Sequence, residues 1–184
     1  VDIEQEEIFR DEEDEEDEID DDMFEIESEA GQTALMIASR RGRIEIVEML
    51  IKAGANMNAK DFDGNTALFV DPDMSIDPIV ETDIATLLIE NGANMNIKNF
   101  SGNTALMFAI MFSSYRVAKL LIEKGADMES KNNKGNTALM EASNFNRIEI
   151  VTLLIEKGAD VNAKNDKDGS TALMIASNRG CLLN

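Results

Sequence analysis

A five-residue motif occurs five times in this chain and constrains its fold more than any other feature. The motif is Gly-Asn-Thr-Ala-Leu with at most one change, and its threonines lie 33, 38, 33 and 34 residues apart. A near-constant period of this length indicates a row of supersecondary units, each of which stacks on its neighbours to bury its apolar face. The five copies are at residues 31–35, 64–68, 102–106, 135–139 and 169–173.

Each unit contains the pattern of two short helices and a turn. In the first unit, Thr33 can cap the N-terminus of an inner helix, which is expected to end near Gly42. An outer helix is expected over residues 44–52, where apolar side chains share one face. The extended segment 55–60 and the turn 61–64 lead to the next threonine, and we call this projecting segment of each unit its finger. The predicted fold is an all-α repeat solenoid of helix-turn-helix units with β-turn fingers.

Two units depart from this pattern. In the third unit, Ser113 replaces the glycine between the two helices, which predicts an altered corner because a residue with a Cβ is disfavoured at positive φ. In the second unit, both prolines of the chain, Pro72 and Pro78, follow the motif. Proline lacks an amide donor and disfavours helix in the residue before it. The second inner helix is therefore expected to be cut short, with a longer bulge and an outer helix over residues 82–90.

The fifth unit is incomplete. An inner helix is expected over residues 171–177, but only residues 181–184 follow Gly180, so no outer helix is predicted. A terminal unit normally protects the stack with a polar outer face. We interpret this end as truncated or as covered by a partner. The units are expected at residues 28–60, 61–98 with the insertion, 99–131, 132–164 and 165–184.

Acidic residues are concentrated before the first unit. Residues 1–30 contain 18 of the 37 acidic residues and one of the 17 basic residues, so they carry −17 of the net charge of −20. Such a block repels itself and buries little apolar surface. Residues 1–27 are therefore predicted to be a disordered acidic tail, followed by the repeat domain at residues 28–184. The alternative is a short helical cap whose apolar stripe is Ile19, Met23 and Ile26.

Composition argues against several functional classes. The chain has no histidine and one cysteine, Cys181, which excludes an intramolecular disulfide, a histidine-based triad and zinc sites built from histidine or several cysteines. No apolar run approaches the roughly 18 residues needed to cross a bilayer. The excess of acidic residues argues against nucleic-acid binding. We therefore expect no enzymatic activity, no cofactor, no bound metal, and neither a membrane nor a nucleic acid as partner.

The insertion of the second unit has alternating oxygen-bearing side chains, as at the start of a calcium-binding loop. Such a loop also requires a glycine in its middle and a glutamate at its twelfth position, and both are missing here. The segment is therefore interpreted as a polar loop. The side chains concerned are Asp71, Asp73, Ser75 and Asp77.

Several further features recur with the motif. They include a Thr-x-Leu start to the inner helix, a glycine between the helices at Gly42 and Gly180, and Gly-Ala-Asp-Val-Asn at residues 158–162. This combination resembles the ankyrin-repeat family, and the resemblance covers residues 28–184. The chain departs from the Thr-Pro-Leu-His of that family, since it has Thr-Ala-Leu-Met. The residues expected to fill the core in place of the histidine are Met36, Met107, Met140 and Met174.

The resemblance implies that the chain binds another protein through its finger tips and the concave side of its inner helices. The corresponding finger positions are Phe62, Asp63, Asn65, Phe100, Ser101, Asn103, Asn133, Lys134, Asn136, Lys167, Asp168 and Ser170. The corresponding helix positions are Arg40, Arg41, Met111, Phe112, Asn144, Phe145, Asn178 and Arg179.

Four of these positions are phenylalanines, which the repeat pattern itself does not require. Because aromatic side chains often dominate interface energetics, we interpret them as anchors for the partner. The alternative is that the rings only pack across neighbouring units, since scattered exposed apolar residues are common. The four residues are Phe62, Phe100, Phe112 and Phe145.

The acidic tail suggests a second function. A polyanionic segment would attract a basic partner, or would fold back on the repeats and compete with a ligand. Either attraction would weaken with salt, over a screening length of roughly 8 Å at physiological ionic strength. The basic residues that the tail would mask are Arg40, Arg41, Lys131 and Lys134.

Overall fold

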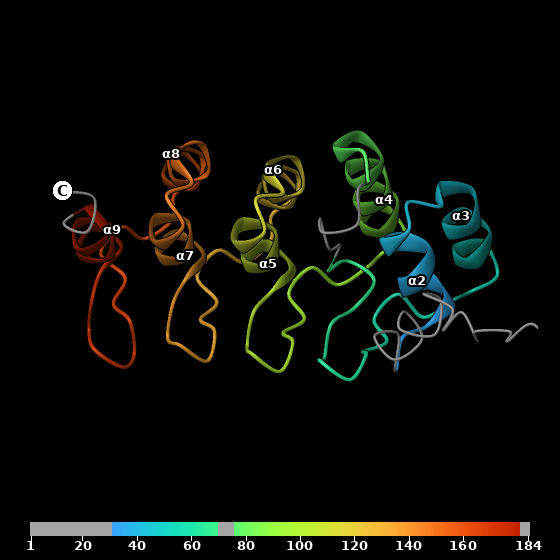
Figure 1. Cartoon of the computed structure of the whole chain (residues 1–184), viewed down its shortest axis with the longest axis horizontal. Helices are drawn as coiled ribbons and strands as arrows, with labels where there is room; N and C mark the ends of the chain where they lie inside the picture. The colour runs from blue at the N-terminus through green and yellow to red at the C-terminus, as the bar shows by residue number, and fades with distance from the viewer. Residues whose placement is uncertain (1–30, 70–75, 181–184) are drawn as a thin grey trace, which may run out of the picture. The chain divides into compact units, whose positions relative to one another are not determined.

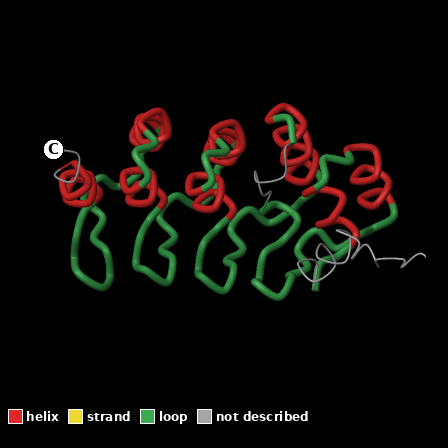
Figure 2. The backbone as a smooth tube through the Cα atoms, in the orientation of Figure 1, coloured by secondary structure: helices red, strands yellow, loops and turns green. Residues whose placement is uncertain are grey.

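Pairs of short helices alternate with projecting fingers in the computed structural model, which describes residues 31–69 and 76–180 (Figure 1). Figure 2 shows that the fingers are loops, and the described residues contain no strand. This confirms the predicted all-α repeat solenoid. The helices are α2 (Ala34–Arg40), α3 (Ile44–Lys52), α4 (Pro78–Glu90), α5 (Ala105–Met111), α6 (Tyr115–Glu123), α7 (Ala138–Asn144), α8 (Ile148–Glu156) and α9 (Ala172–Gly180).

The helices form an inner and an outer row, with the core between them. The inner helices α5, α7 and α9 contact one another in series, as do the outer helices α3, α4, α6 and α8. Within a unit, α2 packs on α3, α5 on α6 and α7 on α8. None of the helices in the described ranges is long and apolar enough to cross a membrane.

The repeated motif builds this core. Its threonine caps the inner helix, as at Thr104, whose side-chain oxygen accepts a hydrogen bond from the amide of Met107 at 3.4 Å. Its leucine is at most 3% exposed in the first four units. The methionine that follows is buried at Met36, Met107 and Met140, as predicted, whereas Met174 in the last unit is exposed.

The corner at Ser113 is not altered, and that prediction is wrong. Ser113 has a φ of 69°, equal to that of Gly42 at the same position of the first unit. The next residue closes the turn in the same way, since the Ser114 amide donates to Ala109 at 2.9 Å and the Arg43 amide donates to Ala38 at 2.9 Å. The helices packed on both sides of the corner therefore impose the backbone conformation, whatever the residue.

The second unit is irregular, as expected, but its outer helix begins earlier than predicted. Residues 66–69 form a turn, and no helix begins there. Helix α4 starts at Pro78 and not near Thr82, because Asp77 caps it by accepting a hydrogen bond from the Ile79 amide at 2.8 Å. Proline at the first helical position loses no intrahelical hydrogen bond. In the fifth unit, α9 likewise continues past the predicted end, to Gly180.

The described residues, 31–69 and 76–180, belong to one compact unit. The predicted acidic tail at 1–27 and its alternative helical cap lie outside the described residues, as do Asp71, Asp73 and Ser75 of the calcium-like segment. Residues 181–184, with Cys181, also lie outside them.

Helix α4 carries a buried carboxyl group, and this predicts how stability depends on pH. Glu81 is 6% exposed, and burial raises its pKa above 4.5. The nearby Ser114 hydroxyl lowers the pKa of Glu81 by a smaller amount than burial raises it. The two groups do not form a well-aligned hydrogen bond, since Ser114 Oγ and Glu81 Oε1 both have no hydrogen-bond partner among the described residues. The folded state thus favours the protonated carboxyl, and stability falls as the pH rises from the unfolded to the folded pKa.

We expect Glu81→Gln, which mimics the protonated side chain, to raise the Tm at pH 7 by a few degrees. The difference from the wild type should disappear below pH 4.5, where the wild-type carboxyl is also protonated. Thermal melts of both proteins at pH 7 and pH 4 measure it. The exposed carboxyl of Asp83 serves as the control, since Asp83→Asn should not produce this pH-dependent gain. A gain of equal size at both pH values would contradict the assignment.

Candidate protein-binding surface

Hydrogen bonds hold neighbouring fingers side by side (Figure 2). The backbone amide of Phe100 donates to the carbonyl of Asp63 at 2.9 Å, and the backbone amide of Asn133 donates to the carbonyl of Ser101 at 3.0 Å. A lysine ladder adds one bond at each step, since each ammonium group donates to the carbonyl of the matching lysine in the next unit. These bonds are Lys60 to Lys98 at 2.7 Å, Lys98 to Lys131 at 2.8 Å and Lys131 to Lys164 at 2.8 Å.

Asparagine side chains form a second ladder, which involves three of the predicted contact residues. The asparagine that precedes the motif threonine accepts a hydrogen bond from the first asparagine of the next finger. The bonds are Asn99 to Asn65 at 2.9 Å, Asn132 to Asn103 at 2.9 Å and Asn165 to Asn136 at 2.6 Å. Asn103 is 7% exposed, so the structure places its side chain between fingers and not on their surface.

A buried glutamate that sequence reasoning missed completes this ladder. Glu141 on α7 is 2% exposed, and its Oε1 accepts from Asn132 at 2.7 Å and from Asn136 at 3.0 Å. A carboxylate buried in this way needs such donors. The signal in the sequence was an acidic residue at a position where the other inner helices carry an apolar one, such as Ile37 or Phe108.

The finger tips of the second and third units present two aromatic rings. Phe62 is 74% exposed and Phe100 is 66% exposed. Each ring also lies against the preceding finger, because a Cβ built on Gly31 would be 2.7 Å from the Phe62 ring, and one on Gly64 would be 3.0 Å from the Phe100 ring. One edge of each ring therefore packs between units, while most of the ring faces solvent. The remaining exposed tip residues of the predicted set are Asp63, Ser101, Asn133, Lys134, Lys167 and Asp168.

The inner helices of the third and fourth units add further aromatic side chains. Phe112, at the end of α5, is 42% exposed and lies 4.4 Å from Phe108 between ring centroids. Phe108 in turn contacts the buried Phe69 edge to face, with centroids 5.4 Å apart. Phe145 is half-buried, and Cζ of the Arg147 guanidinium lies over its ring, 5.9 Å from the ring centroid. Phe112 thus continues a chain of contacting rings from the core to the surface.

The other predicted helix residues differ in exposure. Arg40, Met111 and Asn144 are half-buried, whereas Arg41 and Asn178 are exposed. The side chain of Arg179 lies outside the described part of the chain. The predicted set is therefore spread over several units, and its exposed aromatic members belong to the second and third.

Comparison with known families agrees with this architecture. A profile described as ankyrin repeats (3 copies) matches residues 80–165 and 128–183, and another, ankyrin repeats (many copies), matches residues 25–68. The chain belongs to the ankyrin-repeat family. Ankyrin repeats are generally protein–protein interaction modules and are typically not enzymes. No curated protein sequence matches the chain.

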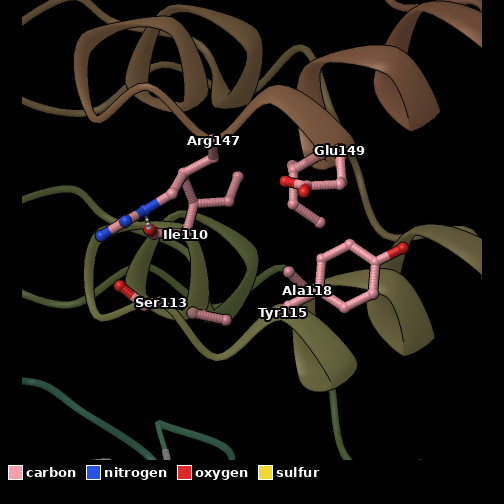
Figure 3. Close-up of a pocket in the computed structure, with 8 residues that line it drawn as sticks. Ile110, Ser113, Tyr115, Ala118, Arg147 and Glu149 are labelled. Carbon is pink, nitrogen blue, oxygen red and sulfur yellow. Dashed lines mark hydrogen bonds between the residues drawn. The ribbon is translucent and has the colours of Figure 1, made fainter.

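The ankyrin-repeat domain also contains a pocket of about 430 Å³ between the third and fourth units (Figure 3). Arg147 donates from Nε to the Ile110 carbonyl at 3.2 Å and from Nη2 to the Met111 carbonyl at 3.3 Å, at the C-terminal end of α5. Tyr115 and Glu149 lie on the other side of the pocket, as Figure 3 shows. Arg147 thus ties the two units together, a role that its sequence position did not reveal. The described residues contain no cluster of carboxylates or thiols able to hold a metal ion.

Proposed function

We propose that this ankyrin-repeat chain binds another protein through its finger tips and the exposed side of its inner helices. The observation that carries the proposal is the pair Phe62 and Phe100, which are 74% and 66% exposed on neighbouring fingers. Large aromatic side chains on a protein surface supply most of the contact energy when a partner covers them. The family to which the chain belongs supports a protein as the partner.

The fingers present these rings in a preorganised arrangement. The Phe100 amide is hydrogen-bonded to the Asp63 carbonyl, next to Phe62, so the two tips are fixed relative to each other. Preorganisation of this kind increases affinity because little conformational entropy is lost on binding. Phe112 supplies a third exposed ring on the inner helix of the third unit. The partner is accordingly expected to contribute apolar side chains to the centre of the interface.

Removal of the two rings tests this proposal. We expect Phe62→Ser combined with Phe100→Ser to reduce capture of a protein partner from the source cell's lysate by about tenfold or more, since each buried Phe contributes roughly 1.5–3 kcal/mol. Captured proteins are quantified by mass spectrometry beside the wild type. Ile46→Ser is the matched control, because Ile46 is an apolar residue 49% exposed on the outer helix α3.

Thermal melts of the same variants distinguish binding from packing. A protein that is lost with the double variant, but kept with Ile46→Ser at an unchanged Tm, supports the proposal. Unchanged capture would contradict it, and a large fall in Tm without a specific loss of partner would assign the rings to packing between units. Capture with residues 30–184 at low and high salt shows separately whether the acidic tail contributes, since attraction by the tail weakens with ionic strength.

A further inference from the structure

The pocket of about 430 Å³ between the third and fourth units has an apolar floor. The floor residues come from α5, α6 and α8 and are at most 4% exposed, and they are Ala109, Ile110, Ala118 and Ile150. All the lining residues belong to the third and fourth units, which the structure describes throughout. The pocket is therefore bounded by two whole units of the domain.

The same place between the first and second units is filled by side chains of this chain. Ser113 lines the pocket at the corner between two helices, and Gly42 occupies this corner in the first unit. A Cβ on Gly42 would meet Ile76 at 3.2 Å and Val80 at 3.3 Å. Val80 lies in the additional first turn of α4, which has 13 residues where α8 has 9. Because α8 lacks this turn, the place beside Ser113 stays open.

One wall of the pocket combines an aromatic ring with a carboxylate. Tyr115, the first residue of α6, is 44% exposed, whereas α3 and α8 each begin with an isoleucine. The Glu149 carboxylate points into the pocket (Figure 3) and forms no ion pair with the described residues. An aromatic ring and a carboxylate above an apolar floor fit a cation that carries a hydrocarbon stem.

The positive charge of the lining belongs to Arg147 and lies at the opposite side of the pocket (Figure 3). Its guanidinium is held there by the carbonyls of Ile110 and Met111, at 3.2 and 3.3 Å, and by the ring of Phe145. These carbonyls form the C-terminal end of α5, where partial negative charge offsets a cation. The charge that a ligand meets at the other wall is therefore that of Glu149.

We propose that this pocket binds an arginine side chain of a partner protein. The hydrocarbon stem lies on the apolar floor, and the planar guanidinium donates to Glu149 and stacks on the Tyr115 ring. A groove between α6 and α8 continues from the pocket, since Tyr115 and Glu149 line both, and it offers room for the partner's backbone. The site is separate from the finger tips, and the inference does not depend on the function proposed above.

Tyrosine fluorescence reports on this pocket, because Tyr115 is the only tyrosine of the chain and the chain has no tryptophan. The probe is N-acetyl-arginine amide, which has the charge and shape of an arginine within a protein. Titration into the full chain is expected to change the fluorescence with half-saturation at about 1 mM. The neutral analogue N-acetyl-citrulline amide should bind about tenfold more weakly or less. Titration of N-acetyl-tyrosine amide with each probe corrects for collisional quenching.

Two substitutions with the same change of charge locate the binding site. Glu149→Gln keeps the shape of the side chain and should weaken binding of the arginine probe by about tenfold. Glu156→Gln changes a residue that lines the neighbouring groove and not the pocket, and it should leave the affinity unchanged. Both glutamates are exposed, so both variants are expected to fold, and thermal melts check this.

Several results would overturn the proposal. They are equal binding of the two probes, equal affinity of Glu149→Gln and the wild type, and absence of a saturable change up to about 10 mM probe. Equal weakening by Glu149→Gln and Glu156→Gln would attribute the response to the net charge of −20 and overturn it as well. Tighter binding of N-acetyl-lysine amide would contradict the assignment to arginine. Tighter binding of free arginine would contradict the assignment to a protein side chain.

Discussion

Gly102→Ala is expected to destabilise the ankyrin-repeat domain by about 2–5 kcal/mol. Gly102 has a φ of 76°, and a Cβ at this position would lie 2.6 Å from the backbone nitrogen of Asn133 in the next finger. A left-handed conformation costs a residue with a Cβ roughly 1–2 kcal/mol. Displacement of the neighbouring finger adds about 1–3 kcal/mol and disturbs the hydrogen bond between the Asn133 amide and Ser101.

Gly125 provides the matched control. Its φ is 84°, but a Cβ on it would have no neighbour within 4 Å. Gly125→Ala should therefore lower the free energy of unfolding only by the cost of the left-handed backbone conformation, about 1–2 kcal/mol. Urea unfolding of both variants measures the difference. Equal losses of stability would show that close contact between fingers does not constrain Gly102.

Asn132→Ala is expected to cost a similar amount, about 2–5 kcal/mol. The Asn132 side chain is 7% exposed, and its amide donates to Asn103 at 2.9 Å and to Glu141 at 2.7 Å. Its oxygen accepts from the amides of Lys134 and Asn136, both at 3.0 Å. Truncation of Asn132 leaves the buried Glu141 carboxylate with one hydrogen-bond donor fewer. An unsatisfied buried polar group costs about 1–3 kcal/mol of stability, or more when it is charged.

Asn162 is the control for this change, because it is exposed and its side chain makes no hydrogen bond within the described part of the chain. Asn162→Ala should change the free energy of unfolding by no more than about 0.5 kcal/mol. Combining Asn132→Ala with Glu141→Ala tests the mechanism directly. The two losses should be less than additive, because each substitution removes the same hydrogen bond. Strict additivity would contradict the proposed link.

Much of the fold could be predicted from local signals. The first unit shows this, since α2 follows its predicted cap Thr33, and α3 covers residues 44–52 as expected. Two of the differences between prediction and structure share one cause. The prolines predict an interruption, although Pro78 with Asp77 before it begins a helix. Ser113 predicts an altered corner, although the packed helices impose the regular one. In both cases the context outweighs the intrinsic preference of one residue.

The candidate site was less predictable. Phe62 and Phe100 were found by their position in the finger, and they are exposed. The same reasoning predicts surface side chains at Asn65, Asn103 and Asn136, yet these side chains connect neighbouring fingers. The partners of these bonds are about one repeat away in the sequence, so spacing within a unit does not show in which direction a side chain points.

The sequence by itself determined that this protein is a row of helical repeats with methionines among its core residues, because period, caps and apolar faces are local properties of each unit. Only the tertiary structure decided which polar residues join the fingers and which aliphatic residues remain uncovered. Leu139 and Leu173 occupy the same motif position, yet one is 3% exposed and the other 75%. The difference comes from the helices packed against each of them, since exposure depends on neighbours that other units supply.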